Sequence, residues 1–404
     1  VLDHVIVRDN SAILAGGGLN ARNMPVTVTH SLFQQNTSTN NVGGALVTGA
    51  DFGVVAPVLI SNTTFISNAA LCPSLFGICD GGAVSTFDQE VTVVNSLFEN
   101  NRCNNLVEDD CDGGGLRLTR SFNASQLTLI NTDFISNTAD GNGGGVHASV
   151  TTTVIAGRFE RNAAGGRQTA FSDGGGGMRV RTLFLTGTEF ISNTSGEDGG
   201  AILVDTNAVI RDARLTANRA VTNGAGLYVA FSLAPVLISN TTFTSNTAGM
   251  NGGGAYVSLG DARVTGGRFE RNRASGPEND GGLLTTQNGG GGLWVGRDLT
   301  VRDTEFISNV AETNGGGAHV RGQATLSGGQ FVQNQSLGDF LAIQGYGGGG
   351  LVVAGPLSLT GTTFTGNQAA IGGGGIHSQG TGGRSGGLLQ DNTAIANSGC
   401  WYGN

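Results

Sequence analysis

The hexapeptide TEFISN occupies Thr188–Asn193 and recurs unchanged at Thr304–Asn309. Close variants end at Asn68 (TTFISN) and at Asn137 (TDFISN). The shared element is Phe-x-x-Asn, in which Val or Leu takes the place of Phe at a few steps. A step that returns at a spacing of 25 residues or more marks a structural repeat rather than a chain of unrelated domains. Its closing Asn falls at residues 10, 36, 68, 101, 137, 162, 193, 218, 246, 272, 309, 334, 367 and 392.

Apolar residues alternate in front of each step. The positions five and seven residues before the Phe are apolar in nearly every repeat, as in Leu299/Val301 and Leu357/Leu359. Alternation with a period of two places both side chains on one face of a strand. A third apolar position lies thirteen residues before the Phe, as at Val146. Each repeat therefore predicts three short strands separated by Gly or Asn corners.

Short strands at this period predict an all-β parallel solenoid of about 13–14 coils with three strands per coil, because one repeat cannot bury its own apolar face. The solenoid should cover residues 1–392 as one domain, followed by a C-terminal tail at 393–404. Phe should fill the interior at one height of every coil. Asn should turn one corner in the left-handed conformation and bond to the Asn of neighbouring coils. Glycines should occupy the other corner, where there is no room for a β-carbon.

The pairing of G-G-[AG]-[ILV] with F-x-x-N resembles the repeat of chlamydial polymorphic outer membrane proteins. It is also similar to the secreted bacterial parallel β-helices with pectin-lyase-like folds. The resemblance extends from Val5 to Asn392 and implies a right-handed, single-stranded parallel β-helix. It further implies a cell-surface or secreted protein with a structural or adhesive role.

Composition excludes several classes of function. Glycine is abundant, at 71 of 404 residues, but without the Gly-X-Y period of collagen. The net charge is −9 and there is no Lys, so the basic face needed for nucleic-acid binding is missing. No apolar run is long enough for a transmembrane segment. The expected extracellular or cell-surface location is the one that the resemblance implies.

Five cysteines support that location. Cys72 and Cys79 bracket one short segment, and Cys103 and Cys111 bracket another. Neither pair has the spacing of a zinc knuckle, so two disulfides in an oxidising compartment are favoured. Whether they close within each segment or cross between segments stays open. Cys400 is left as a free thiol or an intermolecular link.

One outward-facing row is the candidate binding stripe. The residue after the first inward apolar position is aromatic, His or Arg in many coils, and these residues should stack on the outside of one sheet. An exposed row of this kind can stack on sugar rings or contact a protein receptor, although outward strand positions also favour aromatics for packing alone. A stacked His metal site is the least favoured interpretation. The candidate residues are Arg117, His147, Arg179, Tyr228, Tyr256, Trp294, His319 and His377.

The rival function is a carbohydrate-active enzyme, a lyase or glycoside hydrolase on the same fold. Such enzymes need aligned Asp or Glu on one row. Residues such as Asp205, Asp261 and Asp298 stand singly, and the densest acidic group, EDDCD at 108–112, lies in an insertion. We therefore predict no catalytic residues, no cofactor and no metal site.

The ends of the solenoid offer a further surface. An uncovered coil exposes strand edges that can pair with another chain. Head-to-tail stacking of copies into a filament is therefore expected as one form of the structural role. The residues of this candidate intermolecular joint are Leu2, Val5 and Val7 at one end, and Cys400, Trp401 and Tyr402 at the other.

Overall fold

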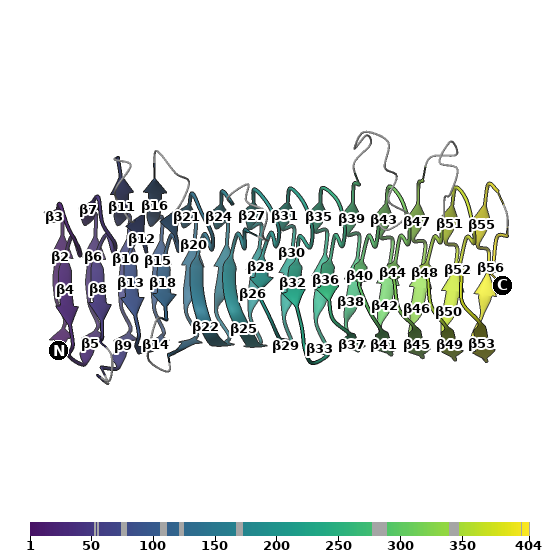
Figure 1. Ribbon diagram of the computed structural model, residues 1–404, viewed down its shortest axis with the longest axis horizontal. Coiled ribbons are helices and arrows are strands. Elements are labelled where there is room, and N and C mark those ends of the chain that lie inside the picture. The colour runs from purple at the N-terminus through teal and green to yellow at the C-terminus, as the bar shows by residue number, and fades with distance from the viewer. Residues whose placement is uncertain are drawn as a thin grey trace. The chain divides into compact units, whose positions relative to one another are not determined.

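The computed structural model describes residues 1–51, 54, 56–73, 79–105, 111–120, 125–166, 173–276, 289–338, 347–396 and 398–403. These residues form strands, turns and bends, with no helix among them. The chain divides into two compact units, Val1–Asp205 and Thr206–Asn404, which are described separately. In both units every assigned strand pair is parallel (Figure 1).

Unit 1 contains three stacked sheets, here called A, B and C. Sheet A contains β1 (Leu2–Asp3), β4 (Leu19–Arg22), β5 (Val26–Thr29), β8 (Leu46–Gly49), β9 (Val58–Ser61), β13 (Val84–Phe87), β14 (Glu90–Val94), β18 (Leu116–Thr119), β19 (Gln126–Ile130), β22 (Val146–Ile155), β25 (Met178–Thr186) and β28 (Ile202–Val204). Sheet B contains β2 (Ile6–Arg8), β6 (Leu32–Gln34), β10 (Thr64–Ile66), β15 (Leu97–Glu99), β20 (Asp133–Ile135), β23 (Arg158–Glu160) and β26 (Glu189–Ile191). Sheet C contains β3 (Ser11–Ala12), β7 (Thr37–Thr39), β11 (Ala69–Cys72), β16 (Arg102–Asn105), β21 (Thr138–Ala139), β24 (Ala163–Ala164) and β27 (Thr194–Ser195), and β12 (Cys79–Asp80) pairs separately with β17 (Cys111–Asp112).

Unit 2 repeats the arrangement. Its part of sheet A contains β29 (Ala208–Arg211), β32 (Leu227–Phe231), β33 (Val236–Ser239), β36 (Ala255–Leu259), β37 (Ala262–Thr265), β40 (Leu293–Val295), β41 (Leu299–Arg302), β44 (Ala318–Val320), β45 (Ala324–Ser327), β48 (Leu351–Val353), β49 (Leu357–Thr360), β52 (Ile376–Ser378), β53 (Gly382–Ser385) and β56 (Trp401–Gly403). Sheet B contains β30 (Arg214–Thr216), β34 (Thr242–Thr244), β38 (Arg268–Glu270), β42 (Glu305–Ile307), β46 (Gln330–Val332), β50 (Thr363–Thr365) and β54 (Leu389–Gln390). Sheet C contains β31 (Arg219–Ala220), β35 (Thr247–Ala248), β39 (Arg273–Ala274), β43 (Val310–Ala311), β47 (Gln335–Ser336), β51 (Gln368–Ala369) and β55 (Thr393–Ala394).

The predicted right-handed parallel β-helix is confirmed. Sheet B contributes one strand per coil, seven to each unit, in agreement with the predicted 13–14 coils. Most coils carry two predicted strands in sheet A and the Phe strand in sheet B. The structure adds a short strand after the Asn, in sheet C. The alternating apolar pairs are in register between coils, for example Leu299 with Ala324 and Ala324 with Leu357.

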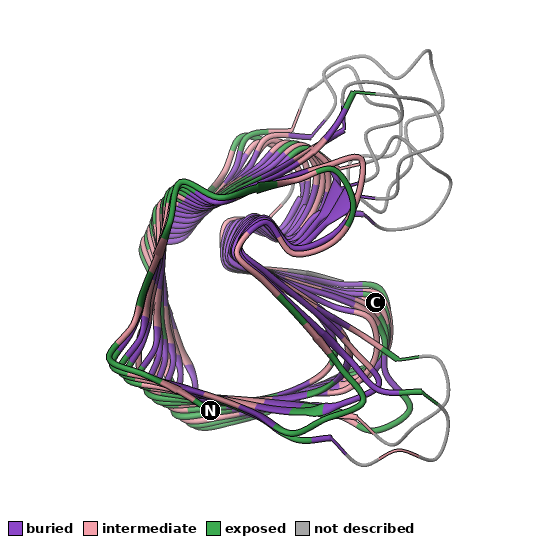
Figure 2. Cartoon of the chain, turned by 90° about the vertical axis from the view of Figure 1, so that its left-hand side faces the viewer, coloured by how far each residue is buried: buried purple, intermediate pink, exposed green. Residues whose placement is uncertain are grey.

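A phenylalanine stack fills the interior beside sheet B. In unit 1 the rings of successive coils are stacked at centroid distances of 4.6–4.9 Å, and in unit 2 at 4.5–4.9 Å. Viewed along the stack, buried residues line the inner side of the coil (Figure 2). Nearly all of each ring is removed from water, which makes this row a main contributor to stability. The rings are Phe33, Phe65, Phe98, Phe134, Phe159 and Phe190 in unit 1, and Phe243, Phe269, Phe306, Phe331 and Phe364 in unit 2.

The asparagine that closes each step forms a second buried row. The Nδ2 of Asn137 donates to Oδ1 of Asn162 at 3.0 Å and to the carbonyl of Phe98 at 2.9 Å. In unit 2 Asn309 donates in the same way to Asn334 and to Phe269. Each amide therefore satisfies buried backbone groups of the neighbouring coils, as the sequence predicts.

The conformation predicted for this Asn is wrong. The left-handed residue is the one before it, for instance Ser136 with φ 55° and Ser308 with φ 52°. A second left-handed residue lies three positions before the Phe, for instance Asn131 with φ 46°. The Asn itself points inward, because its amide is needed to satisfy buried backbone. The residue immediately before the Asn makes the turn instead.

The glycine corner is confirmed, and two positions show why it needs glycine. Gly252 has φ 60°, and a β-carbon there would lie 2.7 Å from the β-carbon of Tyr256. A β-carbon on Gly144 would lie 2.4 Å from the carbonyl oxygen of Ala163 in sheet C. The chain thus returns from sheet C to sheet A in backbone contact, which any larger residue would prevent.

The predicted boundary after residue 392 is not a break in strand pairing. β55 pairs with β51, and β56 pairs with β52 through Ile376–Trp401 and His377–Tyr402. The segment predicted as a tail therefore includes two strands of the stack.

Candidate functional sites

The structure aligns the candidate binding stripe within each unit. In unit 1 Arg117 pairs with His147, and His147 with Arg179. In unit 2 Tyr228 pairs with Tyr256, and the row continues in register through Trp294, His319, Val352 and His377. The predicted vertical alignment is therefore present in both units.

The predicted exposure is wrong for half of the stripe. Trp294, His319 and His377 are at most 4% exposed, and Tyr228 is 6% exposed. The cause is the glycine corner of the same coil, which folds back over the row. A β-carbon on Gly290 would lie 2.4 Å from the carbonyl oxygen of Leu293 and 2.9 Å from the β-carbon of Trp294, so the glycine turn lies directly against the start of this row. These four side chains therefore cannot stack directly on a glycan. The remaining stripe residues, Arg117, His147, Arg179 and Tyr256, are partly exposed.

In unit 1 this layer is ionic. Arg117 is paired with Asp80 and lies 4.0 Å from Asp112, and His147 Nδ1 lies 2.9 Å from the Asp112 carboxylate. Both aspartates belong to the short β12–β17 ladder, and their side chains are only 3–4% exposed. Buried charges of this kind need partners, because desolvation is costly.

A second ion group follows in the next coil. Arg179 Nη1 donates to Asp173 at 2.9 Å, and its Nε donates to Asp205 at 3.3 Å. Burial alone would lower the pKa of Arg179, but these two carboxylates raise it above its ordinary value. Arg179 is therefore held as a cation inside the layer.

The two buried aspartates have opposite pKa shifts. Burial raises the pKa of Asp80 to about 7, although the Arg117 guanidinium opposes the shift. Burial alone would also raise the pKa of Asp112, but His147, Arg117 and the backbone N–H of Asn142 together hold that pKa well below its usual range. One carboxyl thus gains a proton near neutral pH while its neighbour stays ionised.

In unit 2 the layer is aromatic. Tyr228 and Tyr256 stack with ring centroids 5.3 Å apart, and Tyr256 and Trp294 stack at 4.3 Å. His319 follows Trp294 at 6.2 Å in a tilted arrangement. Burial lowers the pKa of His377 to about 4, so this imidazole is neutral at physiological pH.

Sequence reasoning missed the acidic partners of the stripe. The signal was present, because Asp or Asn precedes the glycine pair at Asp80, Asp112, Asn142 and Asp198, five residues before the stripe position. The first three form a ladder, in which the backbone N–H of Asp112 donates to Asp80 at 3.3 Å and that of Asn142 donates to Asp112 at 2.8 Å. The expectation that no acidic residues are aligned is therefore wrong for unit 1. Residues 108–110 of the EDDCD group lie outside the described residues.

Both predicted disulfides are present, and each closes within its own segment, Cys72–Cys79 and Cys103–Cys111. Cys79 and Cys111 are in register on β12 and β17. The four sulfurs pack with Ala70 and Ala139 in a small buried cluster beside sheet C. The two disulfides thus supply core volume where the strands are very short.

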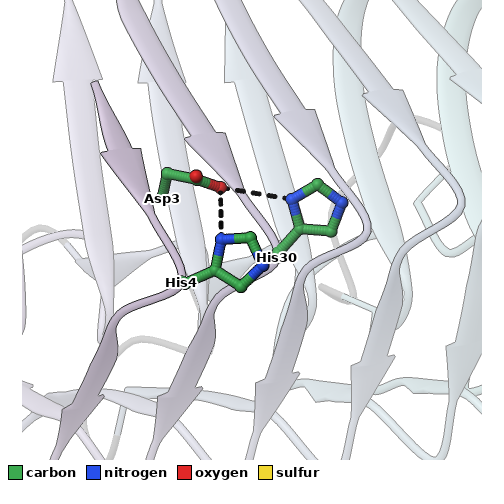
Figure 3. A group of neighbouring side chains, drawn as sticks. All are labelled: Asp3, His4 and His30. Atoms are coloured by element: carbon green, nitrogen blue, oxygen red, sulfur yellow. Dashed lines mark hydrogen bonds and ion pairs between the residues drawn. The ribbon is translucent and has the colours of Figure 1, made fainter.

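A group that the sequence does not indicate lies at the corner between sheets A and B of the first two coils. Asp3, His4 and His30 place their ligand atoms within 4.8 Å of one another (Figure 3). Hydrogen bonds from Thr29 first, and then from His4 and His30, hold the pKa of Asp3 below its usual range. The two histidines are 26 residues apart, which hides the pair in the linear sequence.

The predicted intermolecular joint is partly exposed. Leu2, Val5 and Val7 are half-buried in the first coil of unit 1. Cys400 is an exposed free thiol, and Trp401 is half-buried and pairs with Ile376. Tyr402 pairs with His377 through its backbone. The described residues also include no helix long and apolar enough to span a bilayer.

Comparison with known proteins agrees with the resemblance seen in the repeats. The repeat of the Chlamydia polymorphic membrane protein family matches residues 361–379. The chain is also 29% identical over 180 residues to the probable outer membrane protein pmp20 of Chlamydia pneumoniae. That match covers 37% of this chain and 10% of the relative, so it spans only a small part of the longer protein. No solved structure gives a significant match. The chain therefore carries a repeat of the chlamydial polymorphic membrane protein type within a right-handed parallel β-helix.

Proposed function

We propose that this chain is a cell-surface β-helix that acts as a structural stem with adhesive faces, and that it is not an enzyme. The observation that carries the proposal is the uniform interior of both units. Phe stacks on Phe and Asn bonds to Asn in one coil after another. Such an interior is suited to rigidity rather than to chemistry at one coil. The similarity to a probable outer membrane protein and the two disulfides support a surface location.

We expect the adhesive contact to use faces other than the stripe, because half of the stripe residues are buried and the others are only partly exposed. We therefore expect Trp294→Leu to leave adhesion unchanged when the protein remains folded. Beads coated with purified protein should bind to a target cell surface, and soluble protein should compete. A glycan array and a protein-ligand screen would then separate the two classes of receptor. Failure of folded protein to bind any surface above an albumin control would contradict the adhesive role.

Self-assembly is a further part of this proposal. Exposed Cys400 next to a strand at one end of the chain, and half-buried Val5 and Val7 at the other, support head-to-tail stacking. Light scattering should show particles with a mass greater than that of one chain. Cys400→Ser or a reducing agent should decrease the size of these particles. A single-chain mass at high concentration would contradict it.

One observation favours the enzyme as a second candidate. Neighbouring carboxyls with pKa values pushed apart, as in Asp80 and Asp112, are typical of acid–base pairs. Their side chains are almost completely buried, however, and are already paired with Arg117 and His147. We therefore expect no cleavage of acidic polysaccharides. Product formation that is lost in Asp80→Asn would favour the enzyme.

A further inference from the structure

The first two coils of unit 1 place two histidines at equivalent positions of one corner. His4 and His30 both have left-handed backbone, with φ 54° and 47°, and each follows a strand of sheet A. β1 and β5 are in register, with Asp3 opposite Thr29, so the next residues of the two coils are neighbours. Their rings stack with centroids 4.7 Å apart. The repeat geometry itself thus brings the two imidazoles together.

Asp3 completes a three-ligand group. Its Oδ1 lies 3.0 Å from Nδ1 of His4 and 3.2 Å from Nδ1 of His30 (Figure 3). Thr29 donates its hydroxyl to the same oxygen at 2.6 Å, which fixes the position of the carboxylate. Each of the three side chains is at least half exposed, so an ion can reach them from solution.

All three ligand atoms lie within 4.8 Å of one another, and rotation of one exposed imidazole out of the ring stack would let both Nδ1 atoms face a single ion. Zinc binds imidazole nitrogen and carboxylate oxygen at about 2.0–2.2 Å in a tetrahedral arrangement, which separates neighbouring ligand atoms by about 3.3 Å. The two oxygen–nitrogen distances at Asp3 are close to that value. Two imidazoles with one carboxylate favour zinc and similar transition metals over calcium and magnesium.

We propose that Asp3, His4 and His30 form a divalent transition-metal site, with zinc as the representative ion. Asp3 Oδ1 and the Nδ1 atoms of His4 and His30 are the protein ligands. One tetrahedral position remains for water or for a donor from another molecule. The ion would join the first two coils at their shared corner. This site is independent of the proposed adhesive role.

Asn62 is the positioning residue of the site. It occupies the same corner one coil further on, with φ 49°, and its Nδ2 lies 3.4 Å from Nε2 of His30. When Nδ1 of His30 binds a metal, Nε2 carries the proton. The Asn62 amide then turns to offer its oxygen. Such outer partners orient ligating histidines and typically change metal affinity about 10–100-fold.

The test is a calorimetric titration of ZnCl₂ into tag-free, chelator-treated protein near neutral pH. The whole chain carries Cys400→Ser, which removes the exposed thiol as a competing ligand. We expect one zinc per chain, tighter binding of Cu²⁺, and no binding of Ca²⁺ or Mg²⁺ at the same concentrations. His4→Asn and His30→Asn should each abolish the one-to-one binding. Asn is chosen because it tolerates the left-handed backbone.

A matched pair of variants tests the positioning role. Asn62→Gly should weaken zinc binding about 10-fold. Asn131→Gly, at the same corner two coils beyond Asn62, should leave it unchanged. Because glycine accepts positive φ, neither change strains the backbone.

The imidazole signals of the unsubstituted histidines give a readout that does not depend on variant folding. Zinc should shift the NMR signals of His4 and His30 and leave those of the buried His319 and His377 in place. Absence of zinc binding, equal binding in the His4→Asn and His30→Asn variants, or shifts confined to other histidines would overturn the proposal.

Discussion

The two units build the same coil but fill the layer under the glycine corner differently. In unit 1 this layer contains Arg117, His147 and Arg179, and each is close to an aspartate. In unit 2 the same row contains Tyr228, Tyr256 and Trp294 stacked on one another. The Phe stack and the Asn ladder are alike in both units.

The difference shows that this position accepts several residue types, provided that the residue at the same position of the next coil is a suitable neighbour. A parallel, in-register stack places each side chain against the residue at the same position of the next coil. A charge is acceptable there if the neighbouring coil supplies its partner, and an aromatic ring is acceptable if the next residue is also flat. The interior rows admit no such alternative, because only Phe and Asn fill them in most coils.

The largest effect should come from the shared frame. Phe134→Ala in unit 1 and Phe306→Ala in unit 2 should each cost about 3–5 kcal/mol, because both rings are fully buried. Chemical denaturation measures the loss. Phe184→Ala is the control and should cost clearly less than either change, because that ring is 44% exposed. Unequal losses for Phe134 and Phe306 would contradict a common frame.

The next largest effect should come from the Asn ladder. Asn137→Ala and Asn309→Ala each remove two hydrogen bonds that the amide nitrogen donates and two that the amide oxygen accepts. Each change leaves a buried Phe carbonyl without this donor. The cost should be about 3 kcal/mol in both units. Hydrogen exchange of peptides around each site measures it locally. The exposed Asn20 of β4 supplies the control, and a cost in Asn20→Ala as large as in Asn137→Ala would exclude the ladder as the cause.

Removing a disulfide should destabilise unit 1 and leave the stability of unit 2 unchanged. Replacing both Cys103 and Cys111 with Ala opens a loop of sequence separation 8, which corresponds to about 2.5 kcal/mol in the chain-entropy account. Exchange should rise in peptides of unit 1 and stay the same in unit 2. Peptides near Phe306 serve as the internal control. A uniform rise throughout the chain would show that the two units unfold together.

The last effects, which act over only part of the pH range, should come from pH and have opposite sign in the two layers. The folded pKa of Asp80 is raised to about 7 from an ordinary 3.8, so its contribution to stability is lost as pH rises between these values. The folded pKa of His377 is lowered to about 4 from 6.5, so its contribution is lost as pH falls through that range.

Asp80→Asn should therefore remove the loss of unit 1 stability between about pH 4 and pH 7, and His377→Gln should remove the acid-side loss in unit 2. Local hydrogen exchange at several pH values, corrected for the intrinsic rate, measures both. The exposed Asp9→Asn is the control. Retention of the wild-type pH profile in Asp80→Asn would assign the effect to another group.

Much of the fold could be predicted because it rests on short-range periodicity. The spacing of Leu299 and Val301 from Phe306 predicts a strand. Because the same spacing recurs along the chain, it also predicts that successive coils stack. The two disulfides could be expected as bonds but not assigned to partners, because pairing within or between adjacent coils satisfies the same spacing.

The site could be predicted only in part. The burial of the stripe residues depends on contacts in the folded chain that the spacing of residues in the sequence does not reveal. Trp294 occupies an outward strand position, but Tyr256 and His319 of the neighbouring coils and the glycine turn at Gly290 lie against it. The number of residues in each coil determines which residues become neighbours. It brings Asp80 next to Asp112, and His4 next to His30. That number varies because insertions change the spacing.

The central claim is that equivalent residues of successive coils are in-register neighbours. It is tested most directly by nitroxide labels at Thr300 and Thr325, which are exposed register partners in unit 2, in a Cys400→Ser background. Register partners lie about 4.8 Å apart across the sheet, so the spectrum should show strong dipolar broadening. Labels at Thr300 and Ser358, two coils apart, should show weaker broadening. Equal or absent broadening in both pairs would contradict the stacked β-helix.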